Sequence, residues 1–179
     1  MSMFEQAPAR QDTPINPHQF IIRQPTPDDG NAVHNLIHKS AFLDNNSLYC
    51  YLLLCTHFST TSAVAMMGAK VAGVVTAYIP PQQPDTLFVW QVAVDAVAQG
   101  QGLASKLLND LLARDNTRHL SFVETTVTGN NTASRALFMS LARRFNTSVS
   151  ESVMFDREQH FLSLHDSEHK LRIGPLERP

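Results

Sequence analysis

Two glycines separate an apolar segment from a helix-like segment in the stretch 99–104, which reads QGQGLA. The preceding residues 87–94 are apolar enough for a buried strand, and leucines recur at helical spacing after Gly102. Glycine lets the backbone approach a ligand closely, and the first N–H groups of a helix have no partner within it. Because the helix dipole also favours negative charge there, the sequence predicts an anion site suited to a pyrophosphate.

A metal site is a weaker hypothesis. His160, His165 and His169 lie close together in the sequence, but no cluster of carboxylates or cysteines accompanies them. Cys50 and Cys55 are five residues apart in one predicted helix, which is not a metal-binding spacing. We therefore expect no metal, and two thiols buried in a reducing compartment.

The elements that must position the glycine turn form a mixed α/β pattern. Apolar periodicity predicts strands over 20–23, 62–67, 71–79, 87–94, 120–127 and 148–155. Helices are expected over about 28–40, 48–57, from about 102 onward, and up to about 144 after a cap at Asn130 or Asn131. The β-α-β-α-β order in the middle predicts a sheet that is partly parallel and otherwise built from antiparallel hairpins. The turn would lie at the carboxyl end of a central strand, where such sheets bind ligands.

Composition excludes several classes of function. The chain has 179 residues, 43% of them hydrophobic and 17% charged, as expected for one globular domain. A formal net charge of −2 provides no field that would hold nucleic acid or a membrane surface. No signal sequence or membrane span is evident, so we expect a cytoplasmic protein. Residues 1–18 read as a disordered leader, 19–160 as the folded domain and 161–179 as a polar tail.

Two blocks of this sequence resemble a known superfamily. QGQGLA at 99–104, after WQVAV, is similar to the acyl-CoA signature of the GNAT N-acetyltransferases. NNTASRALF at 130–138 resembles the second block of that superfamily. The resemblance spans about Phe20 to Phe155 and implies the GNAT fold, a mixed and mostly antiparallel sheet flanked by helices, with acetyl-CoA as cosubstrate.

Longer segments resemble one family within the GNAT enzymes. LDNNSLYCYLLLCTHF at 43–58, TAYIPP at 76–81, PDTLFVWQVAV at 84–94 and ETTVT at 124–128 are similar to the diaminobutyrate acetyltransferases of ectoine biosynthesis. The resemblance implies acetylation of the 4-amino group of L-2,4-diaminobutyrate. It also implies a homodimer, for which the unusually apolar helix 48–57 is a candidate interface.

The resemblance assigns residues to the cofactor. The backbone of the strand would pair with the pantetheine arm, the glycine turn would hold the pyrophosphate, and the second block would contact the far arm of the cofactor. The residues concerned are Val92, Ala93, Val94, Gln99, Gly100, Gln101, Gly102, Leu103, Ala104, Asn131, Ser134 and Phe138.

A substrate with two ammonium groups and one carboxylate requires acidic partners. The expected substrate-binding residues are Asp44, Tyr49, Trp90, Glu124, Glu158 and His160. An alkylammonium has a pKa near ~10.4, so a carboxylate or an ordered water must take its proton. Glu124 and Glu158 are the candidates for this base, with His160 as a competitor.

The second block departs from the superfamily at one chemical position. Many GNAT enzymes carry a general-acid tyrosine where this chain has Phe138. The thiolate would then leave unaided or take a proton from water, Tyr49 or the product ammonium. This departure also supports an alternative, a catalytically silent acyl-CoA-binding protein. A further alternative is an acetyltransferase for another small amine.

Overall fold

The computed structural model describes residues 20–40 and 43–177. One sheet of seven strands runs through these residues in the order β1-β2-β3-β4-β5-β7-β6. The strands are β1 (Ile21–Arg23), β2 (Ala63–Met67), β3 (Lys70–Tyr78), β4 (Thr86–Val94), β5 (Phe122–Val127), β6 (Val149–Phe155) and β7 (Glu168–Ile173). The helices are α1 (Gly30–His38), α2 (Leu48–His57), α3 (Leu103–Ala113) and α4 (Thr132–Arg144). Only β4 and β5 are parallel, so the expected mixed, mostly antiparallel sheet is confirmed.

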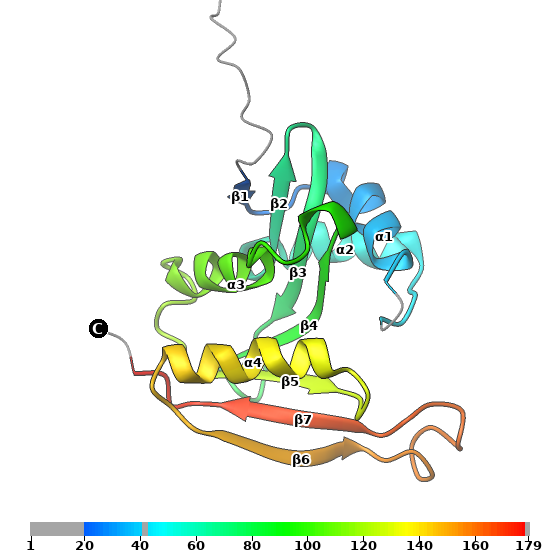
Figure 1. Cartoon of the computed structure of the whole chain (residues 1–179), viewed down its shortest axis with the longest axis vertical. Coiled ribbons are helices and arrows are strands. Elements are labelled where there is room, and N and C mark those ends of the chain that lie inside the picture. The colour runs from blue at the N-terminus through cyan, green and yellow to red at the C-terminus, as the bar shows by residue number, and fades with distance from the viewer. Residues whose placement is uncertain (1–19, 41–42, 178–179) are drawn as a thin grey trace, which may run out of the picture.

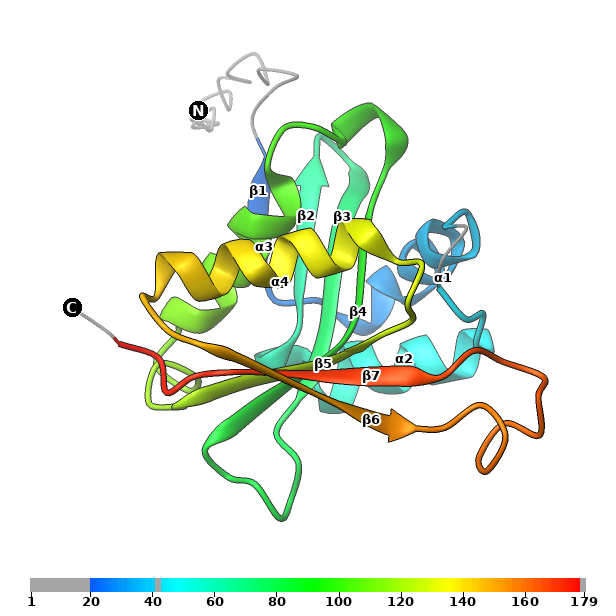
Figure 2. The same cartoon turned by 60° about the horizontal axis from the view of Figure 1, so that its bottom comes forward.

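Helices cover both faces of the sheet. Figures 1 and 2 show α3 and α4 over one face, with α1 and α2 over the other. Strand alternation produces this division: Ala63 and Ala65 of β2 pack with the leucines of α3, whereas Val64 between them packs with α1 and α2. None of the described helices is long and apolar enough to cross a membrane.

The sheet splits along its only parallel pair. β4 and β5 are in register up to Val89 and Thr125, beyond which they no longer pair. On the other edge of β4, Thr76 of β3 pairs with Gln91 and the next β3 residue pairs with Val89, which leaves Trp90 as a bulge. A bulge bends its strand and increases the local twist. The carboxyl-terminal half of β4 therefore diverges from β5 and leaves a gap between them.

The C-terminal segment corrects the sequence prediction. Residues 161–179 were expected to form a polar tail, but Glu168–Ile173 form β7, which lies between β5 and β6. Leu171 and Ile173 are fully buried. Apolar residues occupy only these alternate positions of EHKLRI, and the charged residues between them obscure the strand pattern. The predicted leader 1–18 lies outside the described residues.

Candidate active site

The backbone at the start of α3 has the geometry that the predicted anion cradle requires. Gly102 is the N-cap of α3 with φ 69°, and Gly100 has φ 75°, a left-handed conformation that other residues rarely adopt. A Cβ atom built on either glycine would meet nothing within 4 Å, so the space above the turn is open. The N–H groups of the first helical turn have no carbonyl within the helix. They are available to an anion, while the Leu103 side chain is buried in the core.

The edge of β4 that faces the gap offers backbone groups. Asp95 donates its N–H to a β3 carbonyl at 2.8 Å. Since backbone groups alternate sides along a strand, those of Ala93 also face β3, whereas those of Val92 and Val94 face the gap. The Val94 carbonyl accepts a bond from Gln99 Nε2 at 3.1 Å instead of a strand partner. An extended ligand can therefore pair with Val92 and Val94, but the pairing expected for Ala93 is directed into the sheet.

A groove connects this edge to the cradle. Its wall includes residues of β4, the glycine turn and the first turns of α3 and α4, among them Val92, Val94, Gln99, Ala104, Asn131 and Ser134. Asn131 caps α4 by accepting the Ser134 N–H at 3.1 Å. Most of the predicted cofactor contacts thus line one continuous surface, and the groove suits an extended ligand with an anionic group at its α3 end.

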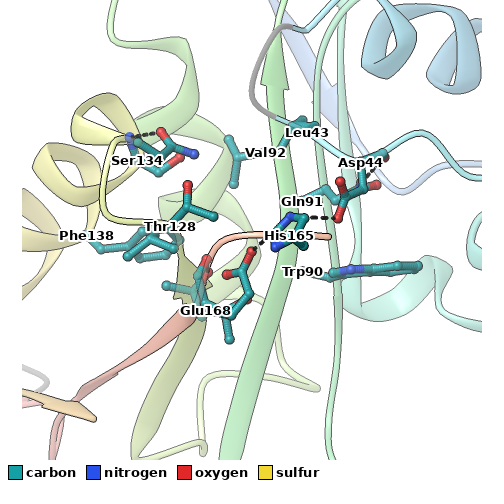
Figure 3. Close-up of a pocket in the computed structure, with 14 residues that line it drawn as sticks. Leu43, Asp44, Trp90, Gln91, Val92, Thr128, Ser134, Phe138, His165 and Glu168 are labelled. Carbon is teal, nitrogen blue, oxygen red and sulfur yellow. Dashed lines mark hydrogen bonds and ion pairs between the residues drawn. The ribbon is translucent and has the colours of Figure 1, made fainter. Parts of the chain in front are cut away.

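A second cavity adjoins the groove at the gap between β4 and β5 and is lined by residues of both strands (Figure 3). It shares Leu43, Val92, Asn131 and Ser134 with the groove. Its further lining comes from the loop before α2, the β4 bulge, the end of β5, α4, and the start of β7 with the segment before it: Asp44, Trp90, Gln91, Thr125, Thr126, Val127, Thr128, Phe138, His165 and Glu168. Trp90 is 36% exposed there, because the bulge turns it out of the core.

Charged side chains gather at one end of the second cavity. His165 lies between two carboxylates, with its Nε2 atom 3.6 Å from Asp44 Oδ2 and 4.0 Å from Glu168 Oε1 (Figure 3). The Glu168 side chain is 18% exposed and that of Asp44 is 78% exposed. Two carboxylates beside a tryptophan can bind an ammonium group through charge and cation–π contact. A carboxylate here can also accept a proton from an amine.

Glu124 is not part of this cavity. Its carboxylate is buried on β5, where Oε1 accepts a bond from Arg172 at 2.6 Å and lies 3.5 Å from Lys170. The predicted role of Glu124 as base or substrate ligand is therefore unsupported, because its carboxylate is already paired with Arg172 and Lys170 of β7. Sequence reasoning missed this pair because it treated residues 161–179 as a tail.

Glu158 and His160 also lie away from the cavity. Both belong to the connection between β6 and β7, where the Glu158 carboxylate accepts the Ser163 hydroxyl at 2.6 Å and is 73% exposed. The His160 ring accepts the Asp156 N–H at 2.8 Å. The residues that reach the cavity follow later in the chain: His165 in the same connection and Glu168, the first residue of β7. An alternating apolar pattern at 171 and 173 was the only signal for them.

All three tyrosines of the chain are described, and none lines the groove or the second cavity. Tyr49 lies on the outer face of α2 and is 68% exposed, whereas Tyr51 is fully buried. Phe138, at the position of the superfamily's tyrosine, is buried at the cavity wall. Neither the groove nor the second cavity therefore presents a tyrosine hydroxyl that could protonate a leaving group.

Within 20–40 and 43–177, no group of three histidine, cysteine or acidic side chains could hold a metal ion. Burial raises the pKa of the Cys55 thiol to about 11, so it is protonated at neutral pH and a poor nucleophile or ligand.

The position of Glu124 leads to a prediction about stability. We expect Glu124→Gln to lower the free energy of unfolding by about 3 kcal/mol, because it leaves Arg172 and Lys170 without their buried counter-ion. Urea denaturation followed by circular dichroism measures this change. The folded variant should keep its enzymatic rate within about twofold. A stable variant that has lost most of its activity would return Glu124 to the role of base.

Comparisons with known proteins agree with this geometry. The model of the acetyltransferase (GNAT) family matches residues 31–142. The L-2,4-diaminobutyric acid acetyltransferase of Methylotuvimicrobium alcaliphilum is 47% identical over 88% of this chain and 91% of its own length. The enzyme of the same name from Vibrio cholerae is 42% identical over 88% and 91%.

A solved structure shows the same architecture. The diaminobutyrate acetyltransferase EctA from Paenibacillus lautus, in complex with its substrate L-2,4-diaminobutyric acid and coenzyme A, is 34% identical. It superposes with a TM-score of 0.85 over 90% of this chain and 98% of its own. The chain described here therefore belongs to the GNAT acetyltransferase family and, within it, to the L-2,4-diaminobutyric acid acetyltransferases.

Proposed function

We propose that this protein transfers the acetyl group of acetyl-CoA to the 4-amino group of L-2,4-diaminobutyrate and yields N4-acetyl-L-2,4-diaminobutyrate. The observation that carries the proposal is a groove that begins at the glycine cradle and ends beside Asp44, Trp90 and Glu168. The cradle suits the pyrophosphate of the cofactor, and the acidic end suits a diamine. The product is the precursor of ectoine, so the cell would use the reaction for osmoprotection.

The pantetheine arm would lie along the free edge of β4. Backbone groups of Val92 and Val94 face that edge and can pair with it as a strand would. An N–H group from the same edge is suited to the thioester oxygen, on which negative charge develops during attack. The thioester carbon is then held at the gap between β4 and β5, next to the second cavity.

The amine attacks the thioester directly. Glu168 takes a proton from the 4-ammonium group, the neutral nitrogen bonds to the thioester carbon, and the carbon–sulfur bond breaks to release CoA thiolate. The thiolate takes its proton from water or from the product nitrogen, because no tyrosine lines the cavity. Asp44 binds the 2-ammonium group and Trp90 packs against the carbon chain. Fixing the 2-ammonium group in this way leaves the 4-amine as the group that reaches the thioester.

Thiol release from acetyl-CoA tests the activity. We expect rapid release of CoA with L-2,4-diaminobutyrate and a kcat/KM at least about 100-fold lower with ornithine and lysine, whose longer chains misplace the amine. NMR of the product should show acetylation on the 4-nitrogen alone. Similar rates with all three amines would favour a GNAT enzyme of broader amine specificity. Binding of acetyl-CoA without turnover of any amine would indicate a silent acyl-CoA-binding protein.

We also propose that the protein works in the cytoplasm as a homodimer. Two apolar surfaces support an interface: the outer face of α2 and the residue that follows it, with Leu53 and Phe58 36% and 40% exposed, and the edge strand β6, with Val153 and Phe155 54% and 40% exposed. Surfaces of this kind commonly mark protein contacts. Light scattering coupled to size-exclusion chromatography measures the mass, and a monomeric mass at micromolar concentration would contradict the dimer.

A further inference from the structure

Gln91 is a buried amide in a strand whose other residues, apart from Thr86 at its start, are apolar. It follows the Trp90 bulge in β4 and is only 4% exposed. A buried amide weakens a core unless its polar atoms are bonded, so its presence calls for a reason. The side-chain Nε2 donates to the backbone carbonyl of Asp44 at 3.0 Å, across a separation of 47 residues.

This bond attaches a loop to the sheet. Asp44 lies before α2, and its side chain is 78% exposed with one ion-pair contact, to His165. Its carbonyl also accepts a long bond from Asn46 Nδ2 at 3.5 Å, which lies in the same loop and does not fix the loop to anything else. The Gln91 amide is therefore the bond that joins the Asp44 backbone to the rigid strand at the cavity wall (Figure 3).

The oxygen atom of the Gln91 amide indicates that this residue does not stabilise the fold. Gln91 Oε1 is buried without a hydrogen-bond partner among the described residues, and so is Oγ1 of Thr76, which lies directly opposite on β3. Native proteins leave few buried polar atoms unpaired. An apolar side chain of the same size would fill this space, and no hydrogen bond to the core would be lost. The Asp44 carbonyl, in an exposed residue, would then be solvated by water.

We propose that Gln91 is a positioning residue that holds Asp44 in place to bind the substrate ammonium group. It acts through its hydrogen bond to the Asp44 backbone and does not itself contact the substrate. The inference rests on the proposed function of the second cavity. It explains why an amide stands in the core of β4 at the point where the strand leaves β5.

The test is Gln91→Met, which keeps the volume and removes the donor. We expect the KM for diaminobutyrate to rise about five- to tenfold, the equivalent of one hydrogen bond, while kcat changes by less than about twofold. The affinity for CoA and the melting temperature should be unchanged or the melting temperature slightly higher. Thr76→Val is the matched control, because it also removes a buried unpaired polar atom at this position but leaves the Asp44 bond intact, and its KM should equal that of the wild type.

A double variant separates positioning from direct contact. If Gln91 acts through Asp44, Gln91→Met should have almost no further effect on KM in the Asp44→Ala background. Additive effects would overturn the proposal, since they would mean that the amide contacts the substrate itself. A Thr76→Val variant as impaired as Gln91→Met would also overturn it, because repacking of the core would then explain both.

One measurement does not depend on the substrate. Hydrogen–deuterium exchange of the ligand-free protein should be faster over residues 44–47 in Gln91→Met than in the wild type, and unchanged in Thr76→Val. If exchange is faster in Gln91→Met but the wild-type enzyme does not acetylate diaminobutyrate, the proposed substrate is disproved and the anchoring bond is still established. Unchanged exchange would refute the anchoring itself, whatever the substrate.

Discussion

Glu168→Gln should lower kcat/KM for diaminobutyrate by about 10²-fold or more, because the amide cannot accept the proton of the attacking amine. Glu168 is the less exposed of the two carboxylates that line the second cavity, at 18% against 78% for the Asp44 side chain. A partly desolvated carboxylate interacts more strongly with an ammonium group than a solvated one does. The variant should have a lower kcat as well as a higher KM, since Glu168 would act on the reacting nitrogen.

Glu158→Gln is the matched control for this prediction. Glu158 lies ten positions earlier in the chain, outside the cavity, with its carboxylate bonded to Ser163. Its replacement should leave kcat/KM within about twofold of the wild type. Steady-state kinetics of both variants, with CoA affinity from calorimetry, decides the matter. A Glu168→Gln enzyme that keeps half its activity, or a Glu158→Gln enzyme that loses it, would reverse the assignment of the two carboxylates.

Gly102→Asp should weaken the binding of CoA by about 10²- to 10³-fold, because a carboxylate at the start of α3 repels the pyrophosphate at short range. The substituted side chain would project into open space, since a Cβ at Gly102 meets nothing within 4 Å. The variant should therefore fold, with a cost limited to placing aspartate at φ 69°. Isothermal titration calorimetry with CoA measures the affinity directly, and turnover should fall with it at fixed acetyl-CoA.

Gly68→Asp isolates the electrostatic part of this effect. Gly68, in the turn between β2 and β3, has φ 61° and equally open surroundings. Unlike Gly102, it has no sequence neighbour that lines the groove. Aspartate there carries the same backbone cost without facing the cofactor. CoA affinity in Gly68→Asp should match the wild type. An equal loss in the two variants would mean that backbone strain alone disturbs binding, and the cradle would lose its support.

The local geometry of the proposed cofactor cradle could be predicted because its parts are consecutive in the chain. A strand, a glycine turn and a helix start follow one another from Thr86 to Ala113, and local backbone conformation creates the anion site. The Asn131 cap and the predicted fold class depend on equally local patterns. Trp90 and Asp44, expected from the resemblance to the family, line the cavity because the bulge and the loop before α2 bring them there.

The acidic half of the site depends on strand pairing between distant segments, which no local pattern encodes. β7 enters the sheet between β5 and β6, and this insertion neutralises Glu124 with Arg172 while it carries His165 and Glu168 to Asp44. Pairing energy depends on which strands become neighbours, and residues 168–173 show only two apolar positions by which to anticipate it. The sequence alone therefore predicted an anion site at the glycine turn and the family that the chain resembles. The tertiary structure decided which carboxylates face the cavity, because the order of the strands pairs Glu124 with two cations of β7 and places Glu168 at the cavity wall beside His165.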